Sequence, residues 1–186
     1  MDRIEEIRRF VPLCEQERRD KEMMLWFLGG NADAYERSNT LAHMTASAWV
    51  LSPDCTRVAM CYHNIFESWS ISGGHADGDR DLLAVAMREV REEMGLATHP
   101  LRPDIFSLEN LTVPGHVKNG RYVSGHLHLN VTYLLQAEGV ELHMKADENS
   151  GVRWMTPEEA VAASTEPWMI QWIYRKLIER AAPYMR

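Results

Sequence analysis

One segment of the chain joins a helical apolar stripe to a row of closely spaced carboxylates. Apolar residues recur at helical spacing from Asp81 to Met94, which predicts an amphipathic helix. Gly95 follows as a natural C-terminal stop, and a loop with Gly73 and Gly74 leads into the helix. The expected buried stripe consists of Leu83, Ala86, Met87, Val90 and Met94. Such a helix needs another layer of structure to cover its apolar face.

The polar side of this predicted helix carries Glu89, Glu92 and Glu93. They stand at positions i, i+3 and i+4, so they project from one face. Carboxylates this close repel one another unless a cation compensates. Mg²⁺ and Mn²⁺ are hard cations that prefer oxygen ligands. Arg88 can pair with one of the acids. A solvated acidic face of a surface helix is the alternative interpretation of the glutamates alone.

The whole segment resembles the Nudix box, G-x5-E-x7-R-E-U-x-E-E-x-G-U, in which U is a bulky aliphatic residue. Gly74 fills the first position. The second half is filled without a gap by Arg88, Glu89, Val90, Glu92, Glu93, Gly95 and Leu96. The loop from Gly73 to Asp79 also resembles a less-characterised Nudix subgroup with a GGHADGD-type loop.

One position departs from the box. Arg80 stands where the pattern has its first Glu, which in the family pairs with the arginine matched by Arg88. Asp79 and Asp81, on either side of Arg80, are candidate substitutes for that pairing. The departure therefore concerns the anchoring of the loop more than the metal site.

The resemblance implies hydrolysis of a diphosphate bond in a nucleoside diphosphate linked to another moiety, with Mg²⁺ or Mn²⁺ as cofactor. By match to the family, Glu92 and Glu93 are the principal metal ligands. Glu89 is a ligand or the catalytic base, Arg88 orients one of the acids, and Gly73 is the expected carbonyl ligand.

An acid in a later loop is a further candidate ligand. Glu148 lies just before a predicted strand, where an acid assists catalysis in some Nudix enzymes. A solvated loop acid is the alternative interpretation of Glu148 and of its neighbour Asp147.

Candidate substrate-binding side chains lie outside the helix. His126 and His128 share one face of a predicted strand, where they can line a substrate pocket, bind a metal or form a polar outer face. His75 directly follows the glycines and is either a substrate contact or a plain loop histidine. Trp69 can stack on a base, with packing as the alternative. His43, at the start of a strand, is interpreted as structural.

The order of predicted elements favours a mixed sheet covered on both faces. Residues 1–28 read as helical, with Pro12 as a break. Strands are expected at His43–Leu51, Arg57–Tyr62, Ile105–Val113, Gly125–Leu135 and Gly151–Met155. Thr156 and Pro157 begin a later helix with an N-cap and a first-turn proline. The resemblance implies an α/β fold, a Nudix-type α/β/α sandwich with a mixed central β-sheet.

The length of 186 residues suits one ordinary domain with a small extension. We expect an N-terminal helical extension at residues 1–40 and a Nudix hydrolase domain at residues 41–186. The residues Met23 to Trp26 are expected to pack on the domain or on a second subunit. Trp49, Trp154 and Trp172 are expected in the core.

The charge balance restricts the class of partner. Lys and Arg number 20 against 27 Asp and Glu, giving a net charge of −7. This excess disfavours long nucleic acids and anionic membrane surfaces, whereas a small nucleoside diphosphate derivative can arrive with its metals. A homodimer is a candidate assembly. The scattered Cys14, Cys55 and Cys61, and an N-terminus without an apolar signal core, favour reduced thiols in the cytoplasm.

Two alternative functions stay open at this point. A non-catalytic Nudix-like module would bind a nucleotide derivative and regulate a partner, and Arg80 keeps this alternative open although the box glutamates are present. A prenyl diphosphate isomerase would use a cysteine and a glutamate, but no matching local motif surrounds Cys55 or Cys61.

Overall fold

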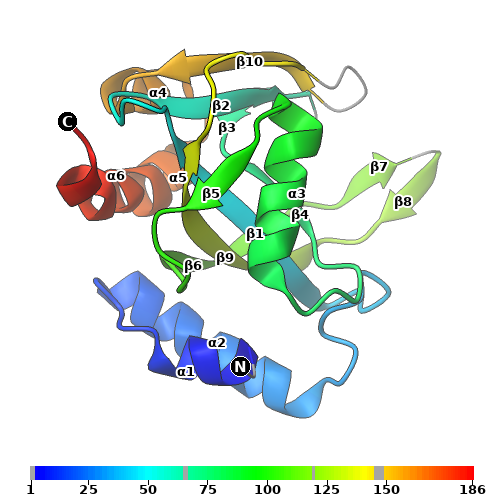
Figure 1. Ribbon diagram of the computed structural model, residues 1–186. Helices are drawn as coiled ribbons and strands as arrows, with labels where there is room; N and C mark the ends of the chain where they lie inside the picture. Colours follow the sequence, from blue (N-terminus) through cyan, green and yellow to red (C-terminus); the bar gives the residue numbers. More distant parts are fainter. Residues whose placement is uncertain (1–2, 65–66, 119, 145–148) are drawn as a thin grey trace.

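The computed structural model describes residues 3–64, 67–118, 120–144 and 149–186 (Figure 1). The helices are α1 (Arg3–Arg9), α2 (Glu15–Gly30), α3 (Leu82–Met94), α4 (Pro157–Ala163), α5 (Pro167–Met169) and α6 (Arg175–Ala181). A π-helical turn, η1 (Ile170–Tyr174), joins α5 to α6, and a 3₁₀ turn, η2 (Ala182–Tyr184), follows. The strands are β1 (Ala42–Leu51), β2 (Val58–His63), β3 (Ser68–Ser70), β4 (Ser72–His75), β5 (Thr98–Pro100), β6 (Ser107–Val113), β7 (His116–Lys118), β8 (Arg121–Val123), β9 (His126–Ala137) and β10 (Asn149–Met155).

A mixed sheet forms the centre of the molecule. Within the described residues it has eight strands, five of them in the order β10-β2-β1-β9-β5, while β3, β4 and β6 pair with β2, β1 and β9. Strands β1 and β9 run parallel, and the other pairs are antiparallel. β7 and β8 form a separate hairpin, seen at the right of Figure 1. The predicted mixed sheet is confirmed.

Both faces of the sheet are covered, because β1 is buried along its whole length. Ala46 and Ala48 belong to a core shared with α1, α2 and α3. Trp49 and Leu51 point to a second core, which contains Leu177 of α6. Alternate residues of a strand point to opposite faces, so the helices flank a central sheet on both sides (Figure 1). The structure is the predicted α/β/α sandwich.

The local sequence signals for helix boundaries are confirmed. Pro12 lies in the connection between α1 and α2. Asp81 caps the N-terminus of α3, and Gly95 caps its C-terminus in a left-handed conformation. Thr156 and Glu159 form a complete capping box at α4. Each of these signals acts within one helical turn, so it can be read without knowledge of the fold.

The predicted buried stripe of α3 needs correction. Leu83 and Met87 are only partly buried, whereas Leu82 and Val85, which the stripe omitted, are buried. The helix therefore faces the sheet with a slightly rotated apolar surface. The pattern of apolar residues allowed both rotations, and packing against the sheet decides between them.

The prediction for the tryptophans holds only in part. Trp49 is fully buried. Trp154 is partly exposed and donates its Nε1–H to the Val140 carbonyl over 2.8 Å. Trp172 is 43% exposed, so its placement in the core was wrong. It lies in η1, where a π-helical turn changes the spacing expected of an α-helix, and Ile173 and Tyr174 are the buried residues instead.

The N-terminal helices pack onto the sheet domain. Ile7, Met24 and Phe27 are buried in the same core cluster as residues of the central strands, although Trp26 remains 76% exposed. The boundary between residues 40 and 41 stays a prediction. None of the helices in the described ranges combines the length and the apolar character that crossing a membrane requires.

Candidate active site

The glycine pair of β4 gives α3 room to approach the sheet. β4 is antiparallel to β1, with Gly73 beside Ser47 and Gly74 beside Ala46. A Cβ atom added to Gly74 would lie 2.4 Å from Cδ of Glu89, and one added to Gly73 would lie 2.3 Å from Oγ of Ser47. Both distances are far shorter than van der Waals contact allows, so the site requires glycine at both positions for space.

Glu93 lies buried between two strands. It is 5% exposed. Its Oε2 accepts a hydrogen bond from the backbone N–H of Gly73, and its Oε1 accepts one from Nδ2 of Asn149, both over 3.3 Å. Two neutral donors thus hold the carboxylate without neutralising its charge. Asn149 was not among the predicted residues, and its only sequence signal is its place directly after the predicted acidic loop.

Glu89 and Glu92 differ in their surroundings. Glu89 is half-buried, whereas Glu92 is exposed. Burial raises the pKa of Glu89, and the negative charges of Glu93 and Glu92 raise it further, while Arg88 opposes these effects. The three carboxylates are therefore close enough to repel one another, as the helical spacing predicted.

Asp79 replaces the missing box glutamate as the partner of Arg88. The Arg88 guanidinium lies 3.5 Å from Oδ2 of Asp79 and 3.5 Å from Oε1 of Glu89. Of the two candidate substitutes, Asp79 makes the ion pair, and Asp81 caps α3 instead. Arg80 lies over the ring of Tyr35, 4.9 Å from its centroid. The departure from the box is thus compensated by the preceding residue.

The carboxylates of Glu89, Glu92 and Glu93 on α3 are suitable ligands for a hard divalent cation. Carboxylate oxygens are the donors that Mg²⁺ and Mn²⁺ prefer. Burial and, after it, the neighbouring charges of Glu93 and Glu92 raise the pKa of Glu89, and a bound cation would relieve the repulsion among these carboxylates. The Glu93 carboxylate accepts neutral N–H groups from Gly73 and Asn149, which orient its oxygens toward the glycine pair and β10.

The predicted histidines come together with a fourth. The rings of His75 and His128 lie 4.8 Å apart, and those of His126 and His128 lie 5.1 Å apart, measured between centroids. His43, interpreted from the sequence as structural, lies about equally close to the other three. No local motif could reveal this, because the cluster depends on the pairing of strands distant in sequence.

Comparison with known families decides the classification. The family model described as NUDIX domain matches residues 41–180, which is most of the chain. The chain belongs to the Nudix family. The prediction of a Nudix hydrolase is confirmed at this level, and the residues of α3 and β4 described above are those of its Nudix box.

Solved structures of Nudix proteins share the fold at low sequence identity. A MutT protein from Methanosarcina mazei Go1 aligns with a TM-score of 0.55 and 14% identity over 80% of this chain and 99% of its own. The dihydroneopterin triphosphate pyrophosphohydrolase of E. coli aligns with a TM-score of 0.53 and 15% identity, over 73% of this chain and 92% of its own. A NUDIX-family hydrolase from Clostridium perfringens aligns with a TM-score of 0.52 and 19% identity, over 73% of this chain and 95% of its own. No curated protein sequence matches the chain.

Two of the predicted site residues, Glu148 and Trp69, are not placed at the Nudix box by the described structure. Glu148 falls outside the described residues, and its role stays a prediction. Trp69 packs edge-on against Tyr62 at 5.6 Å between centroids and lies under the guanidinium of Arg153. These contacts account for its packing, and stacking on a base stays a prediction.

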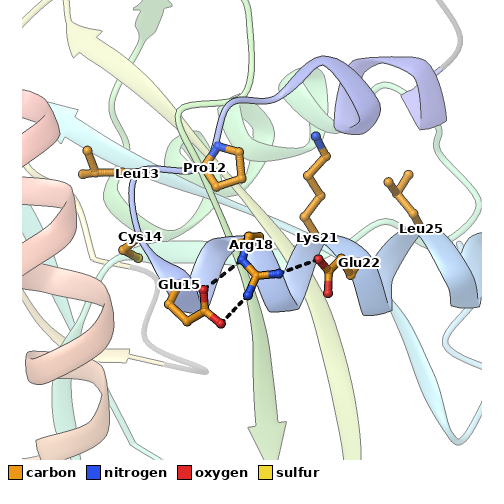
Figure 2. A pocket seen from close by; sticks show the side chains of 8 residues that line it. All are labelled: Pro12, Leu13, Cys14, Glu15, Arg18, Lys21, Glu22 and Leu25. Atoms are coloured by element: carbon orange, nitrogen blue, oxygen red, sulfur yellow. Dashed lines mark hydrogen bonds and ion pairs between the residues drawn. The ribbon is translucent and has the colours of Figure 1, made fainter.

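An open pocket lies away from the Nudix box, on the N-terminal helices (Figure 2). It is lined by the connection from Pro12 to Cys14 and by Glu15, Arg18, Lys21, Glu22 and Leu25 of α2. Figure 2 shows Arg18 paired with both Glu15 and Glu22. The lining combines the cations Arg18 and Lys21 with the carboxylates Glu15 and Glu22, so it carries no excess of positive charge to attract a phosphate.

Proposed function

We propose that this Nudix hydrolase cleaves a diphosphate bond in a nucleoside diphosphate linked to another moiety, with Mg²⁺ or Mn²⁺ as cofactor. The placement of Glu93 and Glu89 against the glycine pair of β4 carries the proposal, because it turns a helical acidic row into a partly buried carboxylate site. One protein of similar structure is named a triphosphate pyrophosphohydrolase, which supports the same reaction class.

The roles of the box residues follow from their surroundings. Glu89, Glu92 and Glu93 would hold the cation, with the Gly73 carbonyl as a further candidate ligand. When bound, the cation would neutralise charge on the diphosphate oxygens and promote activation of a water. Asn149 fixes the Glu93 carboxylate, and Arg88 steadies Glu89. Glu89 acts as a ligand or as the base that takes the proton of the water.

The proposed substrate is small. The net charge of −7 disfavours a long polyanion, and His75, His126, His128 and Trp69 are the candidate contacts beyond the diphosphate. Three free cysteines, two of them buried, support a reducing, cytoplasmic location. A homodimer is proposed as the assembly, to be measured by light scattering.

Activity measurements on variants test the proposal. A panel of nucleoside diphosphate derivatives is assayed for nucleotide release with Mg²⁺ or Mn²⁺. Glu92→Gln and Glu93→Gln are each expected to lower kcat by at least about 100-fold, the upper range for replacing even an outer-shell partner of a metal ligand. Glu179→Gln, an exposed glutamate of α6, is the matched control and should retain full activity. Wild-type rates in both box variants would overturn the assignment.

The two alternative functions predict different outcomes. A non-catalytic module would bind a nucleotide derivative tightly without turnover under either metal. A prenyl diphosphate isomerase would form an isomer without loss of diphosphate. The buried Cys61 does not suit the second alternative, because burial raises the pKa of its thiol and disfavours the reactive thiolate.

A further inference from the structure

Strand pairing places three histidines at one end of the sheet. His43 of β1 lies directly beside His128 of β9 in the parallel register. His75 ends β4 and pairs with Thr45, two residues after His43 on β1. Because residues two apart on a strand share a face, His43 and Thr45 point to the same side. The three histidines therefore converge from three different strands.

The ligand atoms of these side chains are close enough to share one ion. His43, His75 and His128 each offer an imidazole nitrogen, and these nitrogens all lie within 4.8 Å of one another. The ring centroids of the three pairs are 4.8 to 5.0 Å apart. Three protein nitrogens with a fourth position left for water or substrate are the donor set of many catalytic zinc sites.

His43 is held in the form that binds a metal. It is 4% exposed, and its Nδ1 contacts the carbonyl oxygen of Asn39 at 2.9 Å. A carbonyl only accepts hydrogen bonds, so Nδ1 carries the proton and Nε2 carries a lone pair. Within the described part of the chain, that buried Nε2 has no hydrogen-bond partner. Buried acceptors are rarely left unpaired, and a metal ion would satisfy this one.

His126 is placed to orient the cluster. Its Nδ1 contacts the carbonyl oxygen of Ser124 at 2.9 Å, and its Nε2 lies 3.3 Å from Nε2 of His128. The contact with His128 restricts rotation of that ring. Such outer partners commonly fix the ring of a metal-ligating histidine, so we treat His126 as a positioning residue.

The electrostatic environment favours the neutral form of two of these imidazoles, His43 and His128. Burial lowers the pKa of His43, and burial together with the neighbouring histidines lowers the pKa of His128 to about 2. Both rings are therefore uncharged at neutral pH, which is the form that ligates metals.

From this geometry we propose a second metal site in this chain, formed by His43, His75 and His128 and suited to a divalent transition metal of the Zn²⁺ type. Imidazole nitrogen suits Zn²⁺ and Co²⁺, whereas carboxylate oxygen suits Mg²⁺ and Mn²⁺. The histidine site thus differs in its donor atoms from the carboxylates of the Nudix box, although His75 directly follows Gly74, and it does not depend on the proposed hydrolysis.

Metal titration of the full-length protein tests the proposal. After removal of metal with a chelator, Co²⁺ is added in the presence of excess Mg²⁺, which occupies carboxylate sites. We expect one equivalent of Co²⁺ to bind with the visible absorption of a four-coordinate nitrogen site, and Zn²⁺ to displace it. Absence of tight Co²⁺ and Zn²⁺ binding to the wild-type protein would overturn the proposal.

Variants locate the ion. His43→Ala and His75→Ala should each weaken Co²⁺ binding by at least about 100-fold, more than is typical for outer-shell partners. His99→Ala, an exposed histidine of β5, and Glu93→Gln should bind Co²⁺ as the wild type does. Unchanged binding in both cluster variants, or loss of binding in Glu93→Gln alone, would place the ion elsewhere and refute the site.

A measurement on the unmutated protein guards against misfolded variants. Histidine ring ¹⁵N signals are recorded before and after one equivalent of Zn²⁺. The ring nitrogens of His43, His75 and His128 should shift on binding, while those of the exposed His99 should not. Shifts confined to histidines outside the cluster would contradict the proposal even if every cluster variant failed to fold.

Discussion

Gly74 is a residue at which a single methyl group decides the geometry of the site. A Cβ atom there would lie within 2.7 Å of three atoms of the Glu89 carboxyl group. That carboxyl group is the far end of a flexible side chain, so it can move aside at little cost to folding. The Glu89 carboxylate would then leave its position in the site, while the protein would stay folded.

We predict that Gly74→Ala separates activity from stability. Displacement of a catalytic group by about 1 Å can cost on the order of 100-fold in rate, so kcat should fall by about that factor while the melting temperature changes little. Gly29→Ala, where nothing lies within 4 Å of an added Cβ, is the control. Full activity in Gly74→Ala would show that Glu89 has no role that depends on its position.

Asp79 offers a second test at the residue scale. It pairs with Arg88 at 3.5 Å, and both side chains are 42% exposed, so the pair should stabilise the fold by less than about 1 kcal/mol. Asp79→Asn should therefore leave urea unfolding nearly unchanged but lower kcat several-fold, because Arg88 also steadies Glu89. Asp104→Asn, in the exposed pair with Arg102, should change neither quantity. Equal activity in the two variants would argue against Asp79 as the substitute for the missing box glutamate.

At the scale of elements, the helices follow local rules and the short strands do not. The stop of α3 at Gly95 and the start of α4 at Thr156 were readable from single turns of sequence, whereas the N-cap Asp81 of α3 was not predicted. Strands β3, β4 and β5 were not predicted, because they span only three or four residues and carry too little periodicity to distinguish them from loops. The predicted loop with Gly73 and Gly74 is in fact strand β4, and this pairing places the glycines against α3.

The capping box of α4 gives a prediction at this scale. Oγ1 of Thr156 accepts from the backbone N–H of Glu159, and the Glu159 carboxylate accepts from the backbone N–H of Thr156. Loss of such a cap costs about 1 kcal/mol. Thr156→Ala should lower the free energy of unfolding in urea by that amount without changing kcat, since α4 carries none of the proposed site residues. Thr156→Ser keeps the cap and should behave as the wild type, so equal destabilisation by both substitutions would show that the hydrogen bond is not the cause.

At the scale of the whole molecule, a buried ionic network ties the N-terminal and C-terminal helices to the sheet. Nζ of Lys176 in α6 lies 3.0 Å from Glu109 of β6 and 3.5 Å from Glu17 of α2. Arg180 lies 2.5 Å from Glu17. Both glutamates are fully buried, so their charges depend on these cations. Asn130 of β9 donates to Glu109 over 3.0 Å and extends the network to the central strands.

Removing the shared cation should be costly. Lys176→Met leaves Glu109 without its cationic partner, and breaking a buried pair in this way costs roughly 3–5 kcal/mol. The free energy of unfolding in urea should fall by about that much. Arg175→Met, an exposed neighbour on α6, should be nearly neutral. A small effect of Lys176→Met would contradict the role of this lysine as the cation on which the buried Glu109 depends.

The sequence by itself determined the elements whose physics is local. Helix periodicity and capping act over one or two turns, so α3, its acidic row and its ends could be predicted, and the spacing of the box sufficed for the family. Only the tertiary structure decided which carboxylate is buried. Glu93 is enclosed because β10 brings Asn149 to it across 56 positions. The histidine cluster likewise depends on the parallel pairing of β1 with β9. Strand register between distant segments is set by which faces become buried, and no local pattern carries that information.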